Sequence, residues 1–499
     1  MLAWLQLVGV AILTLISLVF RFIERLFIHR DEIALPKRVA VIGGGIAGFG
    51  AAHALCHSGI EVDLFEACDE PGGNAKTHEW RDGARTGLSV LAWPVQYFRN
   101  YGALLKQLGL KTTPVELRFF LRRKDGDSFV HGRTEALSIR YADDLKRWSK
   151  LVELVRSCNK AFARSDVLSL YHFSMLNPMN VLPLRFLCRL MGVSSGFYDE
   201  IITPLHCTTF LDTDLTSVPS LVVPTIDDLI PLNGIPKLES WIGSSRSVFD
   251  GIAKLAGEKL NVHTSSPVSK VRQEADGRWT VYTPTKVEGG YDRIIFASNA
   301  KHASTALPMS WGWMAARRLL GSVEFADETC PMFRKGIIHS DATVIPPDVR
   351  EEVTRTCCNY IVGCGEDEDG CCTFENTFIL SSWYPTVVKG GGEGDGRPRF
   401  VSYGLQSPER VKEPEGEVTN LTNHPKLTPL FCATTMLLRL LQGQGGIFFC
   451  GSMATPGNGH DLSLCSGLVM AMAMGARYPF EGEGDAKADL ERLRVILGL

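Results

Sequence analysis

One glycine-rich turn constrains the fold of this chain more than any other feature. Residues 38–42 read RVAVI, a strand-like run, and Gly43, Gly45 and Gly48 follow in the spacing Gly-x-Gly-x-x-Gly before an Ala-rich, helix-like run. In this pattern the first glycine permits a tight turn, the second lets the backbone approach a pyrophosphate, and the third lets the helix pack closely on the strand. The positive N-terminus of such a helix attracts anions. The pattern therefore predicts a unit that holds the phosphates of a dinucleotide.

An acidic residue lies where such a unit needs one. The run EVDLFE predicts a second strand that ends at Glu66. A carboxylate at this position can accept hydrogen bonds from the hydroxyl groups of a ribose. Glu66 and the turn residues Ile46 and Ala47 therefore complete the predicted nucleotide site.

The length, net charge and cysteine content of the chain exclude several classes of protein. The 499 residues suffice for two or three domains, and the formal net charge of −3 leaves no basic domain that would indicate a nucleic-acid partner. Fourteen unevenly spaced cysteines in a long chain do not form a small disulfide framework. The spacing CC-x5-C-x6-CC from Cys357 to Cys372 matches no common zinc pattern. We therefore expect no metal site.

The N-terminus predicts a membrane anchor. Residues 2–20 form an apolar run without any charged residue, and this run is long enough to span or nearly span a bilayer. Arg21, Arg25 and Arg30 follow it. A basic flank of this kind stays on the cytoplasmic side. A signal or transit peptide is the alternative, but no charge precedes the apolar run and no small-x-small cleavage site follows it closely. We expect a single-pass anchor over residues 1–30, with the catalytic body on the cytoplasmic face of a membrane.

The residues after Glu66 indicate whether the predicted nucleotide is FAD or NAD. Glu66-x5-Gly72-Gly73 resembles the extended fingerprint of FAD-dependent amine oxidases and phytoene desaturase-like enzymes, in which the paired glycines lie near the phosphates of the flavin. NAD dehydrogenases usually lack this extension. Several segments between residues 38 and 480 also resemble an amine-oxidase-like "predicted NAD/FAD-binding" oxidoreductase group, although Asn74 stands where that group often has a histidine. The resemblance implies FAD as the cofactor.

The far end of the chain supplies a second part of the implied site. The run GGIFFCG is followed by a glycine-rich turn, and in similar flavoproteins such a turn places a helix N-terminus under the isoalloxazine ring. In those proteins a residue at the position of Val268 touches the adenine through its backbone, and a plain core valine is the alternative. The resemblance implies cofactor contacts from Gly43, Gly45, Ile46, Ala47, Gly48, Glu66, Gly72, Gly73, Asn74, Thr77, Val268, Gly451, Gly459, His460 and Asp461.

The expected fold class is α/β: a Rossmann-type FAD-binding domain (GR2-like), a mixed α+β substrate domain and the N-terminal transmembrane helix. We expect loops at residues 363–372 and 389–399. The predicted divisions are 1–30 for the anchor, 37–110, 240–300 and 425–480 for the FAD-binding domain, 111–239 and 301–424 for the substrate domain, and 481–499 for a C-terminal helical tail.

Three histidines and one aspartate are candidates for chemistry. His460 could contact the flavin edge or act as a general acid or base near neutral pH, and the alternative is a histidine that only holds the turn. His339 could face the substrate cavity, and the alternative is a hydrogen-bond cluster at the end of a strand. His206 is expected to pack in the interior, and Asp461 is expected to cap the final helix rather than catalyse.

The implied reaction is a two-electron oxidation in which a hydride leaves a C–H bond for the flavin. The anchor and the resembling families suggest an apolar small-molecule substrate such as a lipid or an isoprenoid. Two alternatives stay open at this point. The first is an FAD-dependent double-bond isomerase or hydratase without net oxidation, and the second is a non-catalytic FAD-binding component of a membrane assembly. The number of subunits is not indicated.

Overall fold

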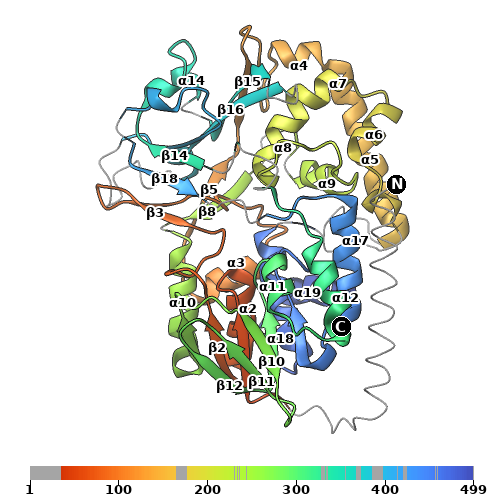
Figure 1. Cartoon of the computed structure of the whole chain (residues 1–499). Helices are drawn as coiled ribbons and strands as arrows, with labels where there is room; N and C mark the ends of the chain where they lie inside the picture. The colour runs from red at the N-terminus through yellow and green to blue at the C-terminus, as the bar shows by residue number, and fades with distance from the viewer. Residues whose placement is uncertain are drawn as a thin grey trace.

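The computed structural model of the chain describes most of residues 35–499 (Figure 1). The predicted anchor falls in residues 1–34, outside the described part. Within the described part, no helix has both the length and the apolar character that crossing a bilayer requires. The other residues outside the description are 164–176, 230, 233, 235–236, 243, 327–331, 333–334, 354–355, 367–371, 385–396, 413, 420–423, 456, 458 and 498.

A five-stranded parallel sheet forms the core of the first domain, in the order β19-β13-β1-β2-β9. The central strands β1 and β13 and the edge strand β19 are short, mostly apolar and almost fully buried, as expected for a parallel sheet covered on both faces. The strands come from three distant stretches of chain: β1 (Arg38–Ile42), β2 (Glu61–Phe65), β9 (Leu260–His263), β13 (Arg293–Phe296) and β19 (Ile447–Phe449). The predicted Rossmann-type architecture is therefore confirmed, while the domain boundaries stay predictions.

Two helices that begin at glycine turns cross closely beside this sheet. They are α2 (Ile46–His57) and α18 (His460–Ala473). A Cβ atom on Gly467 of α18 would lie 2.0 Å from the carbonyl oxygen of Ala47, so the two helix backbones nearly touch. The final apolar helix was expected from the SGLVMAMAMGA run and begins six residues earlier, at His460. The two predicted glycine turns are thus held side by side by their helices.

Three further helices and an antiparallel meander complete this domain. The meander β10-β11-β12 contains the turn at Gly277, whose φ of +82° suits glycine. The C-terminal helix buries Leu490 and Leu493, and Leu497, which directly follows it, is buried as well. The bounds are α3 (Arg99–Gln107), α10 (Arg246–Ala256), α19 (Gly484–Ile496), β10 (Lys270–Gln273), β11 (Trp279–Tyr282) and β12 (Val287–Tyr291).

A seven-stranded mixed sheet forms the second domain, in the order β18-β14-β17-β16-β15-β6-β7. Only β6 and β15 pair in parallel. Strand β15 runs to Glu366 and strand β16 begins at Cys372, so the expectation of a loop over the whole of residues 363–372 was wrong at both ends, and residues 367–371 lie outside the described part. The bounds are β6 (Phe119–Arg123), β7 (Ser128–Val130), β14 (Lys335–His339), β15 (Cys358–Glu366), β16 (Cys372–Ile379), β17 (Phe400–Tyr403) and β18 (Gly416–Thr419).

The two faces of this sheet have different surroundings. We call the face that carries Tyr360 and Tyr403 the inner face, because these residues belong to the main hydrophobic core. The outer face carries Phe120, Ile379 and Phe400, which form a separate small core. Helices α5 (Ala142–Ala163), α6 (Leu184–Leu190), α8 (Thr203–Phe210) and α9 (Val222–Leu229) lie beside the sheet in the same half of the molecule (Figure 1).

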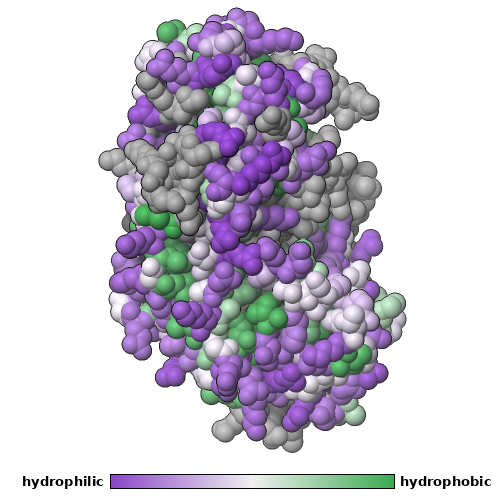
Figure 2. All heavy atoms as spheres, turned by 90° about the vertical axis from the view of Figure 1, so that its left-hand side faces the viewer, coloured by the Kyte–Doolittle hydropathy of each residue, from purple (hydrophilic) through white to green (hydrophobic). Residues whose placement is uncertain are grey.

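Figure 2 shows the side of the molecule that lies at the left of Figure 1. Hydrophilic residues cover most of this face, and hydrophobic residues gather in separate groups in its middle and lower parts. Apolar surface on this side is thus divided among several small groups.

Candidate functional site

Two glycines of the turn are required by the packing of the protein itself. Gly43 has a φ of +116°, and a Cβ atom there would lie 2.6 Å from the carbonyl oxygen of Ala297. A Cβ atom on Gly48 would lie 2.0 Å from the carbonyl oxygen of Gly43. Because both distances are far below van der Waals contact, any other residue would push the turn away from strands β1 and β13. These positions set the shape of the turn.

Gly45 is required for a different reason. Among the described residues, the nearest atom to a Cβ built on Gly45 is the Cα of Gly73, at 3.9 Å, so they leave room for a side chain. Gly45 is the N-cap of α2, and the first turn of that helix contains no acidic residue. The positive end of α2 therefore faces open space that a Cβ atom would fill. This is the geometry that a pyrophosphate needs in order to approach the backbone.

The second pair of glycines packs against the same turn. The N–H group of Gly72 donates a hydrogen bond to the carbonyl oxygen of Gly44 at 2.9 Å. Gly72 and Gly73 have φ values of +139° and +58°, which favour glycine. A Cβ atom on Gly73 would lie 3.2 Å from the Cα of Gly45. The structure thus brings together the two glycine motifs that the sequence separates by more than twenty residues.

Glu66 lies buried at the end of β2, beside the turn. Its Oε2 atom accepts a hydrogen bond from the N–H group of Gly44 at 2.7 Å, and its Oε1 atom accepts one from Cys68 at 2.9 Å. A carboxylate offers about four acceptor positions, of which these bonds use two. The backbone therefore fixes the carboxylate while leaving acceptor capacity for ribose hydroxyl groups.

The C-terminal part of the predicted site meets α2 from the other side. Gly451 follows β19 with a φ of +84°, and its N–H group donates to the hydroxyl oxygen of Ser466 at 2.8 Å. A Cβ atom on Gly451 would lie 3.4 Å from the Cβ of Ala47. Gly459 is the N-cap of α18. Glycines from both ends of the chain therefore surround the start of α2.

His460 is the first residue of α18 and stands edge-on to Tyr101. The ring centroids are 4.8 Å apart and the rings are perpendicular. Burial lowers the pKa of His460 to about 3, so the imidazole is neutral at pH 7. A contact of His460 with the flavin edge and a role in acid–base chemistry stay predictions. What the contacts show is a neutral ring held at the turn.

Asp461 caps a helix, but not the helix that contains it. Its Oδ1 atom accepts a hydrogen bond from the N–H group of Tyr101, in the first turn of α3, at 2.6 Å. The N-cap of α18 is Gly459, and no side chain caps that helix. Burial raises the pKa of Asp461 to about 7. The expected cap on the final helix was therefore wrong, since tertiary contact sends the carboxylate to α3 instead.

The remaining predicted cofactor residues already have partners. Asn74 Nδ2 lies 3.4 Å from Nδ1 and 3.5 Å from Nε2 of His424, and Thr77 Oγ1 lies 3.0 Å from the hydroxyl oxygen of Ser245. Val268 is buried, and its carbonyl oxygen contacts Nε2 of His302 at 2.6 Å. Sequence reasoning did not single out His424 or His302, although both lie beside predicted site residues.

His339 is placed away from these groups, on the outer face of the seven-stranded sheet. Its side chain is fully buried, with Nε2 2.9 Å from the hydroxyl oxygen of Ser402 and Nδ1 accepting from the N–H group of Asp341 at 3.2 Å. Burial, partly offset by Asp341, lowers its pKa to about 4. Both ring nitrogens are used by the protein, which supports the strand-end cluster and not a substrate contact.

One strained residue beside the site was not predicted. Val90 has a φ of +53°, which is rare for a β-branched residue and costs energy. The preceding residue, Ser89, donates from its hydroxyl group to the carbonyl oxygen of Asn74. A Cβ atom on Gly87 would clash with the hydroxyl group of Tyr384, 2.3 Å away. Such strain cannot be read from the local sequence, because only the tertiary contacts impose it.

An aromatic cluster lies next to His460. The indole N–H of Trp241 donates to the hydroxyl oxygen of Tyr101 at 2.9 Å, and Trp93 contacts both rings at 4.9 and 5.1 Å between centroids. All three side chains are almost completely buried. His460, which is itself only partly buried, therefore has a buried aromatic cluster on one side.

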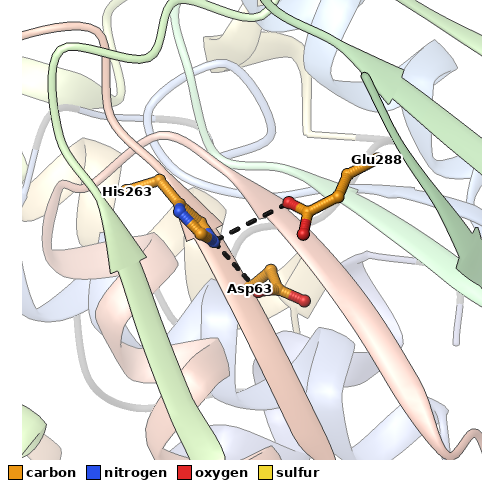
Figure 3. A group of neighbouring side chains, drawn as sticks. All are labelled: Asp63, His263 and Glu288. Atoms are coloured by element: carbon orange, nitrogen blue, oxygen red, sulfur yellow. Dashed lines mark hydrogen bonds and ion pairs between the residues drawn. The ribbon is translucent and has the colours of Figure 1, made fainter. Parts of the chain in front are cut away.

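One cluster in the described part of the chain has enough carboxylate and imidazole groups to suggest a metal: Asp63, His263 and Glu288 (Figure 3). Asp63 already accepts hydrogen bonds from Arg38 at 2.6 and 2.8 Å and contacts His263 at 3.0 Å. Burial opposes ionisation of Asp63, but His263 and Arg38 outweigh it, and its pKa is lowered. A cation would have to displace a guanidinium, so the cluster is best described as an ion network that joins β1, β2, β9 and β12.

Comparison with known proteins gives the following matches. Residues 41–108 match the family described as NAD(P)-binding Rossmann-like domain. An L-amino-acid oxidase from Pseudechis australis is 25% identical over 291 residues, which cover 54% of this chain and 52% of the oxidase. The chain thus spans about half the length of this curated relative.

Two solved structures share the fold over most of the chain. The CLA-producing fatty acid isomerase from P. acnes has a TM-score of 0.61 at 13% identity, covering 89% of this chain and 99% of that one. A putrescine oxidase triple mutant has a TM-score of 0.62 at 15% identity, with the same coverage. At these identities the structural matches speak for the fold alone.

Proposed function

We propose that this chain, a member of the FAD-dependent amine oxidase-like superfamily, is an oxidoreductase that removes a hydride from an apolar small molecule. The observation that carries the proposal is the open space beside Gly45, bordered by Gly73 and the positive end of α2. The packing of the protein does not explain a glycine at this position, whereas a bound pyrophosphate does. The neighbouring acceptor, Glu66, suits the ribose of the same nucleotide.

The residues that would hold FAD come from both ends of the chain. The turn at Gly43–Gly48 and the pair Gly72–Gly73 would hold the pyrophosphate, and Glu66 the ribose. Gly451 and the start of α18 would border the flavin. When bound, FAD supplies an acceptor for two electrons and a proton, and the protein positions the substrate and tunes the ring. A helix N-terminus near the ring stabilises negative charge on it.

The residues of this chain supply the surroundings for that chemistry. Trp93, Tyr101 and Trp241 form a buried apolar wall beside the start of α18, and His460 stays neutral next to them. A dry site favours hydride removal over side reactions with water. None of these side chains is a strong base at neutral pH, which agrees with a reaction in which the leaving group is a hydride and not a proton.

An apolar substrate is supported by the inner face of the seven-stranded sheet. This face is lined by aromatic and aliphatic side chains such as Phe119, Tyr360 and Phe374. The putrescine oxidase and the L-amino-acid oxidase act on polar molecules by name, whereas the isomerase acts on a fatty acid. We include in the proposal the membrane anchor at residues 2–20, which would bring the enzyme to lipid or isoprenoid substrates.

The first experiment is an absorbance spectrum of the full-length protein purified in detergent, beside the variant Gly45→Ala. We expect flavin bands in the wild type and their loss in the variant, with no change in the thermal unfolding temperature of the apoprotein. Anaerobic addition of candidate lipids should then bleach the bands if a hydride is transferred. Wild-type protein that stays colourless after FAD is added would contradict the cofactor assignment.

A second function is favoured by one comparison, the isomerase from P. acnes. An isomerase would convert its substrate without lasting bleaching of the flavin, because no net oxidation occurs. Product analysis by mass spectrometry separates the two, since an oxidation lowers the mass by two hydrogens and an isomerisation leaves it unchanged. A protein that binds FAD and does neither with any lipid would instead be a non-catalytic component.

A further inference from the structure

A buried asparagine without partners lies at the centre of the seven-stranded sheet. Asn376 belongs to β16, the fourth strand in the order of the sheet, and its side chain has no exposed surface. Among the residues that the structure describes, neither its Oδ1 nor its Nδ2 atom has a hydrogen-bond partner. Buried amides are nearly always hydrogen-bonded, because losing water without a replacement is costly. An unpaired amide at such a position points to a partner from outside the chain.

The register of the strands shows which way Asn376 points. It pairs directly with Tyr360 of β15 and Tyr403 of β17, so the three side chains share the inner face. Phe374 and Phe378, two residues before and after it, lie on the same face, and the ring of Phe378 stands 6.0 Å from that of Tyr403. Asn376 is therefore a single amide set in an aromatic surface.

The residues on either side of Asn376 provide a contrast within the same strand. Glu375 and Thr377 point to the outer face, and both are paired: Glu375 accepts from Arg410 at 2.6 Å and from the N–H group of Gln406 at 3.0 Å, and Thr377 contacts the hydroxyl group of Ser402 at 2.7 Å. The fold thus satisfies the polar groups on the outer face of β16 and leaves the one on its inner face unpaired.

Charge is scarce on the inner face. Among the described side chains that β6 and β14–β17 place there, the only charged one is Arg123, at the end of β6, and it pairs with Glu200 at 2.6 Å. A carboxylate or an ammonium group brought to Asn376 would therefore find no free counter-ion among the described side chains of these strands. Because desolvating an unpaired charge costs far more than desolvating a neutral polar group, a charged ligand is disfavoured.

Helix α8 adds a second observation on the same side of the sheet. His206 in this helix is buried, and its Nε2 atom has no hydrogen-bond partner in the described part of the chain. The next residue, Cys207, is near enough to Cys358 of β15 to interact with it electrostatically, which places this helix against the inner face. Burial, and then the nearby His131, lower the pKa of His206 to about 3, so it is neutral as well. The helix therefore also offers a neutral, unpaired polar group.

We propose that Asn376 recognises an uncharged hydrogen-bonding group, such as an amide or an alcohol, on an otherwise apolar substrate. The amide donates through Nδ2 and accepts through Oδ1, so it can pair with a group that does both. The aromatic side chains around it hold the apolar part of the molecule. This assignment rests on the proposed function and narrows its substrate class to neutral amphipathic molecules, which excludes zwitterionic amino acids.

The test uses full-length protein with its cofactor and four probes that share one chain: dodecanamide, 1-dodecanol, dodecanoate and dodecylammonium. Dissociation constants are measured by calorimetric titration in wild type, Asn376→Leu and Asn359→Leu. Asn359 is a matched control, since it lies on the adjacent strand β15, is buried, has an unpaired Oδ1 atom and faces the outer side. We expect wild type to bind the amide and the alcohol at least tenfold more tightly than the two ions.

Asn376→Leu should lose at least tenfold in affinity for the amide while its thermal unfolding temperature stays equal or rises, because leucine fills the space without an unpaired amide. Asn359→Leu should bind as wild type does. Unchanged binding in Asn376→Leu, a preference for an ionic probe, or no binding of any probe by wild type would overturn the proposal.

Two further measurements keep the outcome clear. If Asn376→Leu does not fold, Asn376→Asp replaces it, and the new carboxyl group should shift the preference toward dodecylammonium; an unchanged preference would overturn the proposal. If wild type carries no flavin yet binds dodecanamide through Asn376, the proposed oxidoreductase function fails and this assignment stands. If lipids bleach the flavin equally in wild type and in the Asn376 variants, the oxidoreductase function stands and the assignment of Asn376 fails.

Discussion

The Oε2 atom of Glu66 and the backbone nitrogen of Gly44 are 2.7 Å apart, so a buried carboxylate at the end of β2 is tied to the turn that follows β1. Because this bond fixes the acceptor that would face the ribose, we expect Glu66→Gln to weaken FAD binding by roughly 10- to 100-fold, the effect of about 1.5–3 kcal/mol for a hydrogen bond to a charged group. Flavin fluorescence titration of the apoprotein measures the change. Glu61→Gln, at the exposed start of the same strand, should bind FAD as wild type does.

Two alanine substitutions in one turn should have opposite consequences. Gly48→Ala places a Cβ atom 2.0 Å from the carbonyl oxygen of Gly43, so the apoprotein should unfold at a lower temperature by several degrees or fail to fold. Gly45→Ala meets nothing closer than 3.9 Å, so its apoprotein should unfold like wild type but retain no flavin. Differential scanning fluorimetry and the ratio of flavin to protein absorbance test the pair. Equal losses of stability would contradict the assignment of Gly45 to a ligand.

Asp461→Asn should remove a pH-dependent loss of stability. Burial raises the pKa of Asp461 to about 7 in the folded protein, above the unfolded value of about 3.9, so wild type loses stability as pH rises between these values, by on the order of 1.4 kcal/mol per pH unit. Asparagine does not titrate, and its carbonyl can still accept from the N–H group of Tyr101. The variant should therefore gain in unfolding temperature relative to wild type from pH 5 to pH 8. Asp485→Asn, on the exposed side of α19, should show no such gain.

His339→Gln tests a structural role on the outer face. The pKa of about 4 in the folded protein lies below the unfolded value of about 6.5, so wild type loses stability as pH falls between these values. At pH 7.5 the variant should unfold at a lower temperature than wild type, because the bonds to Ser402 and Asp341 are disturbed. When the pH is lowered from 7.5 to 5, the free energy of unfolding should fall less in the variant than in wild type, by about 2 kcal/mol. His57→Gln, at an exposed position, is the control. A fall in turnover per folded, flavin-loaded molecule would instead support the catalytic alternative.

The nucleotide-binding half of the structure could be predicted because its signals are local. The turn at Gly43 and Gly48 has only one conformation that fits its strand and helix, and the paired glycines at Gly72 and Gly73 need positive φ angles for the same reason. These motifs also predicted that FAD-binding segments from distant parts of the chain meet. The helical tail predicted over residues 481–499 corresponds to α19 (Gly484–Ile496).

The parts that could not be predicted depend on contacts between distant segments. Asp461 looks like a helix cap by its position at the start of α18, but the neighbouring α3 supplies the N–H group that it binds. His339 precedes a serine and an aspartate in a pattern that suggests a site, but the sheet register turns it outward. Asn376 and Val90 carry no signal at all, since an unpaired amide and a strained φ angle exist only once the surrounding strands are in place.

The route of the chain through the five-stranded sheet also affects how the protein is made. The outermost strand beside β13 is β19 (Ile447–Phe449), and the helix that borders the predicted flavin follows it. During synthesis the first two strands leave the ribosome long before this last piece, so the segments that pack on the nucleotide-binding turn are not yet available when the turn is made. Contacts over such long separations in sequence form slowly. Cofactor capture is therefore a late event that depends on an almost complete chain, and a premature stop before β19 would release a polypeptide with an exposed strand edge and no means of covering it.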